Sequence, residues 1–113
     1  MEITISKSGS VEIVELSGRI DATNSGELEK ALTKSIEGGA SKLLIDLENL
    51  EYISSSGLRV FLLIAKMLEK KGKIALCKMQ SQVEQIFTIS GFNTIFPIFA
   101  HREDAVSNLN KVS

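Results

Sequence analysis

The sequence contains few of the side chains on which disulfides, metal sites and catalytic centres depend. It has one cysteine, Cys77, so no disulfide can form within the chain, and a reducing cytosol is the simplest compartment. One histidine, His101, and one cysteine cannot build a structural zinc site. His101 has no evident partner to orient it as a general base, and no Gly-x-Ser-x-Gly motif is present. We therefore expect no enzyme activity, no metal and no cofactor.

Further absences narrow the range of partners. No Gly-x-x-x-x-Gly-Lys phosphate loop is present, so a partner should supply any ATP site. The 13 basic and 14 acidic residues are spread along the chain without a basic stripe, which argues against direct contact with nucleic acid. No apolar run approaches the roughly 20 residues that span a bilayer, and Met1 to Ile5 lack the features of a signal peptide. We expect a cytoplasmic protein without a transmembrane segment.

What the sequence does contain is a regular succession of apolar segments. Its 113 residues are 43% hydrophobic, which suits a single domain spanning residues 1–113. Alternating or continuous apolar runs indicate strands, and longer segments with an apolar face indicate helices. The expected elements are a hairpin from about Glu2 to Ser17 that Gly18 breaks, a helix capped by Asn24 and Glu27 and ending at Gly38-Gly39, a strand from Lys42 to Leu47, a helix from about Ser56 to Lys70, a strand from Lys73 to Cys77, a helix capped by Ser81 and Glu84 with Val83, Ile86, Phe87 and Ile89 facing inward, an edge strand from Ile95 to Phe99, and a helix from Arg102 to about Lys111.

This order of elements predicts the fold class. An opening hairpin followed by alternating strands and helices indicates an α/β domain with a mixed, mostly parallel sheet of about five strands and about four helices. In such sheets the functional loops lie beyond the carboxyl ends of the strands. Two expected loops qualify, Gly18 to Asn24 after the second strand and Glu48 to Ser56 after the third.

The second of these loops ends in three serines, Ser54, Ser55 and Ser56, immediately before an apolar helix. Unpaired backbone N–H groups and the positive end of the helix dipole favour a phosphate at such a place. Serine is also a preferred N-cap residue, worth about 1 kcal/mol over alanine. The local chemistry therefore allows two interpretations of this serine run, a structural cap or a phosphorylation switch, and it does not choose Ser56 over Ser55.

Several segments, in their order and spacing, are recognisable. The chain resembles the STAS domain family, in particular the stand-alone anti-sigma factor antagonists of bacteria, and the resemblance covers nearly all of it. The segments that carry the resemblance are the opening hairpin, Gly18-Arg-Ile-Asp21, Leu43-Leu-Ile-Asp-Leu47, Tyr52-Ile-Ser-Ser-Ser-Gly-Leu-Arg59 and Ile89-Ser-Gly-Phe92.

The resemblance implies a function and a switch. Such an antagonist binds an anti-sigma factor that is also a serine kinase, and this binding releases a sigma factor. The kinase phosphorylates the antagonist and so releases itself, and a serine phosphatase reverses the modification. The serine immediately before the glycine of the motif carries the phosphate, which implies Ser56 before Gly57 in this chain. The family aspartate after the second strand, near that serine, corresponds to Asp21. Ser54 stands where the motif usually opens with an acidic residue.

The other residues at this site have simpler alternatives. Asp21 can be a turn residue that bonds its own backbone, or it can act beside the switch. Gly57 can ease the tight connection from strand to helix, or it can let a kinase approach the backbone. Arg59 can be a solvated surface charge, or it can contact a phosphate or an acidic partner. Ser54 and Ser55 are the remaining hydroxyls that a partner would meet at this loop.

Two functions of different classes follow from the resemblance. The first is a phosphorylation-switched antagonist that acts by occupying an anti-sigma factor kinase. The alternative is an adaptor subunit of a membrane transporter or a stress-signalling assembly, in which Ser56 is never modified. A serine hydrolase that uses Ser56 would be a third class, and the absences described above argue against it. The sequence leaves the oligomeric state open.

Overall fold

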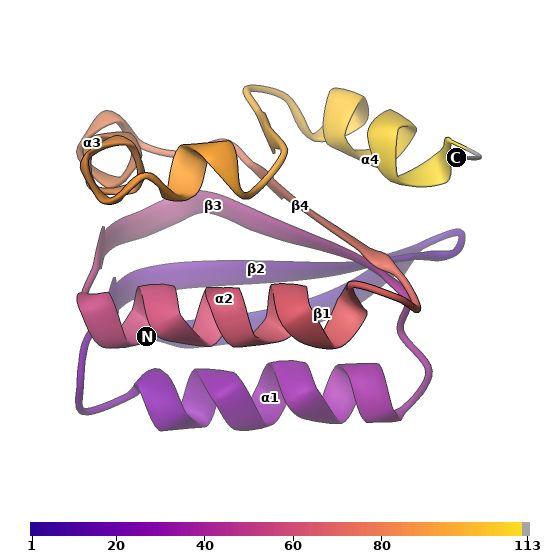
Figure 1. Cartoon of the computed structure of the whole chain (residues 1–113), viewed down its shortest axis with the longest axis horizontal. Coiled ribbons are helices and arrows are strands. Elements are labelled where there is room, and N and C mark those ends of the chain that lie inside the picture. The colour runs from indigo at the N-terminus through magenta and orange to yellow at the C-terminus, as the bar shows by residue number, and fades with distance from the viewer. Residues whose placement is uncertain (112–113) are drawn as a thin grey trace.

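A computed structural model describes residues 1–111, and within them five strands form one sheet in the order β1-β2-β3-β4-β5 (Figure 1). β1 pairs antiparallel with β2, and the three later strand pairs are parallel. This confirms the predicted α/β fold with a mixed, mostly parallel sheet and four α-helices. The elements are β1 (Glu2–Ser8), β2 (Val11–Ile20), α1 (Ser25–Glu37), β3 (Lys42–Ile53), α2 (Ser55–Leu68), β4 (Lys73–Cys77), α3 (Ser81–Ser90), a 3-10 helix (Phe92–Thr94), β5 (Ile98–Phe99) and α4 (Arg102–Asn110).

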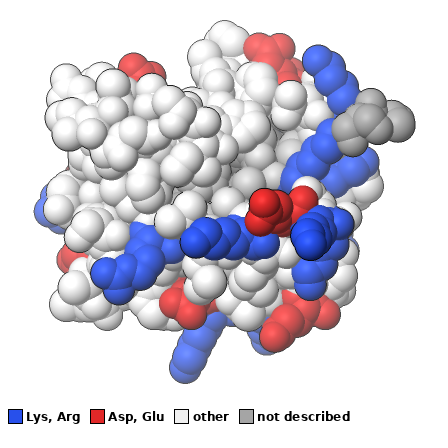
Figure 2. Space-filling model, in the orientation of Figure 1, with Lys and Arg blue, Asp and Glu red and all other residues white. Residues whose placement is uncertain are grey.

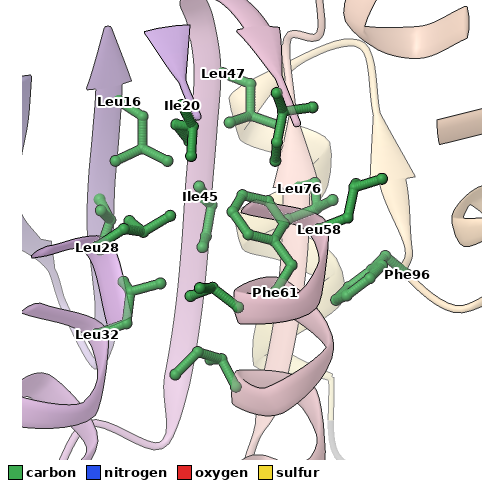
Figure 3. Packing of buried hydrophobic residues seen from close by; sticks show 14 of the residues in the cluster. Leu16, Ile20, Leu28, Leu32, Ile45, Leu47, Leu58, Phe61, Leu76 and Phe96 are labelled. Atoms are coloured by element: carbon green, nitrogen blue, oxygen red, sulfur yellow. The ribbon is translucent and has the colours of Figure 1, made fainter. Parts of the chain in front are cut away.

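The helices cover both faces of the sheet. α1 and α2 lie next to each other on one face and form the main core with the central strands. Figure 3 shows Leu28 and Leu32 of α1 and Phe61 of α2 pointing toward Ile45 of β3. α4 lies on the opposite face over a smaller cluster, which also buries the side chain of Cys77 as expected of a small hydrophobic residue. Because both faces are covered, β4 and the first half of β3, up to Leu47, can be nearly continuously apolar.

Three aromatic rings fix the position of α3 against α2. The ring centroid of Phe61 in α2 lies 6.0 Å from that of Phe87 in α3 and 6.2 Å from that of Phe96, both in edge-to-face geometry. This arrangement places the positive edge of one ring against the negative face of another, and it adds to the energy of apolar burial. α3 is therefore held beside α2, close to the carboxyl end of β3.

β2 and β3 are longer than predicted. β2 continues past Gly18 to Ile20, and β3 continues past Leu47 to Ile53. The pairing of these strands shifts register between Glu15 and Ser17 and again between Gly18 and Arg19. Gly18 has a φ of 88°, so this glycine absorbs an irregularity within the strand instead of ending it. The expected loops at these strand ends are consequently much shorter than the sequence suggested.

Other predicted boundaries also need correction. β5 contains only Ile98–Phe99, because a turn follows the 3-10 helix, in which the N–H groups of Ile95 and Phe96 donate back to the carbonyl oxygen of Phe92. β5 is an edge strand as predicted. Neither predicted capping box forms. Asn24 is at the N-cap of α1, but its side chain bonds to other backbone groups, and α3 has its N-cap at Gln80. The amide of Gln80 donates to the carbonyl oxygen of Glu48 at 2.7 Å, which ties the start of α3 to β3.

A buried ion pair fastens α4 to the sheet. Asp46 of β3 is only 3% exposed, and both Nε and one terminal nitrogen of Arg102 donate to its Oδ2 at 3.1 and 2.6 Å. The same terminal nitrogen of Arg102 donates to Glu15 of β2 at 3.2 Å. The hydrogen bond to Asp46 is the main reason that the pKa of Arg102 is raised. From the sequence, Arg102 was expected only to begin the last helix, with no further role.

Candidate functional site

The carboxyl ends of β2 and β3 bring two short loops together. Ile20 and Ile53 are paired in the parallel ladder, and the backbone N–H of Ser54 donates to the carbonyl oxygen of Ile20 at 2.9 Å. Asp21 follows Ile20 directly, and the three serines follow Ile53 directly. The structure thus places the Asp21 loop and the Ser54–Ser56 segment side by side at one end of the sheet.

Ser54, not Ser56, caps the helix. α2 begins at Ser55, and the Oγ of Ser54 accepts a hydrogen bond from the backbone N–H of Gly57 at 3.3 Å. The Oγ atoms of Ser54 and Ser56 are 2.8 Å apart and share a hydrogen bond. The helix thus begins one residue before the approximate start expected at Ser56, and the capping role that we considered for Ser56 belongs to Ser54. This leaves the hydroxyl of Ser56 without a capping function.

The three serines differ in their surroundings. Ser55 is exposed, whereas Ser54 and Ser56 are half-buried. Ser56 lies within the first turn of α2, where backbone N–H groups lack partners in the helix and the first turn carries no acidic side chain. The dipole of a 14-residue helix adds a partial positive charge at this end. The first turn of α2 is therefore electrostatically suited to a phosphate on Ser56.

Gly57 is required by packing. A Cβ atom at this position would lie 2.7 Å from Cγ2 of Ile20 and 2.7 Å from Cγ1 of Ile53. Both isoleucines are buried at the ends of the strands that form the site. Gly57 thus lets α2 begin directly against β2 and β3, which favours the structural interpretation of this glycine. The close contact also fixes the backbone of the serine segment relative to Asp21.

Asp21 forms a local turn. Its Oδ1 accepts hydrogen bonds from the backbone N–H of Thr23 at 2.9 Å and from the hydroxyl of Thr23. These bonds, the side-chain bond first, lower the pKa of Asp21 below its ordinary value. The side chain of Asn24 closes the turn by accepting from the N–H of Asp21 and donating to the carbonyl oxygen of Arg19, both at 2.9 Å. A charged carboxylate is therefore held in a defined position beside the serine segment.

Two arginines border the site. The guanidinium of Arg19 in β2 lies 4.5 Å from the ring centroid of Tyr52 in β3, and these two residues are paired in the ladder. Arg59 is exposed one turn into α2. Within residues 1–111 neither arginine takes part in an ion pair. Arg19 and Tyr52 had no predicted role, because their pairing depends on a strand register that two irregularities shift.

A shallow apolar groove lies beside the serines, between the start of α2 and α3. Tyr52, Ser55, Leu58, Ile86 and Ile89 are among its lining residues. Val83 and Phe87 of α3 are buried as predicted, and Ile86 is half-buried. Ile89 was also predicted to face inward, but it is 87% exposed. It lies two residues after Phe87, roughly half a helical turn, and so on the opposite face of the helix.

Among residues 1–111, no three histidine, cysteine, aspartate or glutamate side chains are grouped as metal ligands would be. No helix in the same part of the chain has both the length and the hydropathy required to cross a membrane. The site presents a hydroxyl on a helix N-terminus, a carboxylate held in a turn, two arginines and an apolar groove.

Comparison with known proteins gives this arrangement a context. BtrV of Bordetella bronchiseptica, which is assigned as an anti-sigma factor antagonist, is 39% identical over 95% of this chain and 93% of its own length. The anti-sigma F factor antagonist of Paenibacillus polymyxa is 30% identical over 100% of this chain and 98% of its own.

A solved structure of SpoIIAA, an anti-sigma factor antagonist in its unphosphorylated form, superimposes with a TM-score of 0.83 at 20% identity and covers 99% of both chains. The phosphorylated form of the Bacillus cell fate determinant SpoIIAA has a TM-score of 0.73 at 20% identity, covering 96% of this chain and 100% of that chain. The family model of the STAS domain matches residues 2–105. With its five-stranded sheet, its matched span and these relatives, the chain belongs to the STAS domain family.

Proposed function

We propose that this protein is an anti-sigma factor antagonist whose binding to an anti-sigma factor kinase releases a sigma factor and is switched off by phosphorylation of Ser56. The observation that carries the switch is the position of Ser56, whose hydroxyl lies in the first turn of α2 and has no capping function. Its segment follows β3 at the end of the sheet where Asp21 follows β2. Two relatives named as such antagonists match nearly the whole chain, and a protein of this fold has been solved in a phosphorylated form.

Phosphate on Ser56 should leave the fold in place. A phosphoserine carries a charge of about −1.5 to −2 at pH 7, and a negative charge at a helix N-terminus gains about 0.3–1 kcal/mol at a surface site. Ser54 can turn its hydroxyl toward the phosphate, since its oxygen already lies 2.8 Å from that of Ser56. Phosphorylation of Ser56 should therefore leave the stability of the isolated domain unchanged or raise it slightly.

The same phosphate should oppose the complex. A partner that covers Ser56 has to remove water from a dianion, and the nearby carboxylate of Asp21 adds repulsion of like charges. An uncompensated charge at an interface costs on the order of several kcal/mol. Affinity should thus fall at least tenfold, a change that requires only about 1.4 kcal/mol. The switch acts through the interface and not through unfolding.

The remaining parts of the cycle belong to partners. The anti-sigma factor, acting as the serine kinase, supplies the nucleotide site that this chain lacks as a sequence motif. A serine phosphatase restores the binding form. We place the whole cycle in the cytosol, and the protein itself performs no catalysis in it.

Reconstitution with purified components tests this function. Each anti-sigma factor of the same organism is mixed with its sigma factor, and the complex is followed by size-exclusion chromatography with and without this protein. We expect one sigma factor to be released by the wild type. Incubation with ATP and the same kinase should then place one phosphate on Ser56, as mapped by peptide mass spectrometry, and Ser55→Ala should not prevent it. Release of no sigma factor would contradict the proposal, and a phosphate mainly on Ser54 or Ser55 would contradict the assignment of the switch.

A further inference from the structure

Tyr52 belongs to two features of the surface at once. Its ring carries the guanidinium of Arg19 at 4.5 Å, and the same residue lines the groove between α2 and α3. An apolar groove and a positive charge are thus joined by one side chain. Neither feature is needed for the phosphoryl transfer to Ser56, so their juxtaposition calls for a separate explanation.

The groove is open and apolar where a partner would approach. Ile89, at 87% exposure, stands at its rim, and Leu58 and Ile86 form part of its wall. Figure 2 shows the face of the molecule that carries α2 and α3: the surface over α3 is largely free of charged side chains, and Lys and Arg gather in a band along α2. An isoleucine this exposed beside other apolar side chains is typical of an interaction site.

The guanidinium of Arg19 places a positive charge beside the groove, where a partner can reach it. Arg19 is exposed, and within residues 1–111 it forms no ion pair. Stacking on Tyr52 restricts the guanidinium, so Arg19 would lose less conformational entropy on binding a partner carboxylate than an unrestrained arginine would. Arg59, also exposed, lies in α2 three residues after Ser56. These charges select a carboxylate and disfavour a basic partner.

The position of the groove identifies which partner meets it. Ser55 lines the groove, and its neighbour Ser56 is the residue that the kinase has to reach. A protein that covers Ser56 therefore also covers this groove. We propose that the groove of Tyr52, Leu58, Ile86 and Ile89, together with the Tyr52-stacked Arg19, docks a segment of the anti-sigma factor that carries an apolar side chain next to a carboxylate. This inference rests on the proposed function, and it names the surface that selects the partner.

Binding measurements with paired variants test this docking surface. The probe is the purified anti-sigma factor whose sigma factor the wild type releases, titrated with unphosphorylated protein. Ile89→Ser and Arg19→Glu should each weaken binding at least tenfold. The matched controls are Ile5→Ser, at an exposed isoleucine on the distant strand β1, and Lys30→Glu, the same charge reversal on α1. Both controls should bind within twofold of the wild type, and circular dichroism should show all four variants folded.

The proposed function and the docking surface can be disproved separately. If the wild type binds no anti-sigma factor of the organism, the proposed function and the docking surface are both wrong. If the wild type binds, but Ile89→Ser and Arg19→Glu stay within twofold of it, only the docking surface is wrong. Equal losses in the controls and in the groove variants would also overturn it, because the effect would then not belong to the groove.

A cross-link identifies the chemistry of the occupant. Ser90→Cys, at an exposed residue that also lines the groove, can be labelled with a benzophenone maleimide, because the native Cys77 is fully buried and burial raises the pKa of its thiol to about 12. Irradiation in the complex should join residue 90 to a peptide of the anti-sigma factor that contains an aspartate or glutamate beside an apolar residue. Replacing that acid with lysine should restore the binding of Arg19→Glu. A cross-link to a second copy of this chain, or to a peptide without a carboxylate, would overturn the proposal.

Discussion

The hydroxyl oxygens of Ser54 and Ser56 lie 2.8 Å apart, and Ser54 also caps helix α2 by accepting from Gly57. Ser54, which stands where the motif usually has an acidic residue, thus uses one oxygen both to cap α2 and to bond to the hydroxyl of Ser56. Because a serine hydroxyl is neutral and can donate, it can remain next to a phosphate on Ser56. An aspartate in its place would meet that phosphate with a like charge.

We expect the cap to belong to Ser54 alone. Ser54→Ala removes the acceptor for the Gly57 N–H and should lower the free energy of unfolding by about 1 kcal/mol, as measured by urea titration of the unmodified protein. Ser54→Asp should retain the cap. Ser56→Ala is the matched control and should change stability by less, because its hydroxyl does not cap the helix. A larger loss for Ser56→Ala than for Ser54→Ala would show that the roles are reversed.

Gly57→Ala should destabilise the fold. The added methyl group would lie 2.7 Å from atoms of both Ile20 and Ile53, which are buried. Overpacking of this kind costs about 1–3 kcal/mol, and we expect a loss in that range by chemical denaturation. Gly26→Ala in α1 is the control, since a Cβ there meets nothing within 4 Å. The control should be neutral or slightly stabilising, and equal effects of the two changes would contradict the packing role of Gly57.

Breaking the ion pair under α4 should weaken the fold without affecting the switch. Arg102→Met leaves the carboxylate of Asp46, 3% exposed, without its partner. The full penalty for a buried pair is about 3–5 kcal/mol, and because the Arg102 side chain is 32% exposed we expect about 2 kcal/mol. The pair of Lys78 and Glu48, 3.9 Å apart, provides the comparison, because its carboxylate is 62% exposed. Glu48→Gln should cost less than about 1 kcal/mol.

A binding measurement on Arg102→Met distinguishes an effect on stability from an effect on partner binding. Titration of the folded Arg102→Met protein against the anti-sigma factor should give the affinity of the wild type, because the pair lies on the face of the sheet that α4 covers. A stability like that of the wild type would mean that the hydrogen bonds of Arg102 contribute nothing net.

Asp21→Ala should affect the switch more than the fold. The carboxylate is held in a local turn by Thr23 and contributes no core packing, so the melting temperature should change little. Binding of the anti-sigma factor, or the rate of Ser56 phosphorylation, should nonetheless fall. Thr23→Val is a useful companion, because it removes the hydroxyl bond to Asp21 but keeps the carboxylate. Strong destabilisation by Asp21→Ala with an intact partner reaction would show that Asp21 is only a turn residue.

Much of the fold was predictable because each element has a clear local signal. The apolar run of Lys42 to Leu47 and the turn at Gly72 set the central strand and the end of α2. What the sequence did not reveal depends on contacts between segments. Gly18 looks like a strand breaker until the register with β3 shows it inside β2. Asn24 looks like a side-chain cap until Arg19 and Asp21 supply its actual partners.

The residues of the candidate site also fall into those that the sequence predicted and those that it did not. Ser56, Asp21 and Gly57 came from a resemblance in short motifs, and the structure places their segments together. The stacking of Arg19 on Tyr52 and the exposure of Ile89 were not predictable. The first depends on two register shifts between neighbouring strands, and the second depends on which face of α3 the ring of Phe87 occupies.

The central claim is that phosphate on Ser56 switches binding and leaves the fold intact. The most direct measurement compares phosphorylated and unmodified protein, each by thermal unfolding and by calorimetric titration against the anti-sigma factor. We predict an unchanged or slightly higher melting temperature together with at least a tenfold loss of affinity. Equal affinity of the two forms, or a melting temperature that collapses on phosphorylation, would contradict this account.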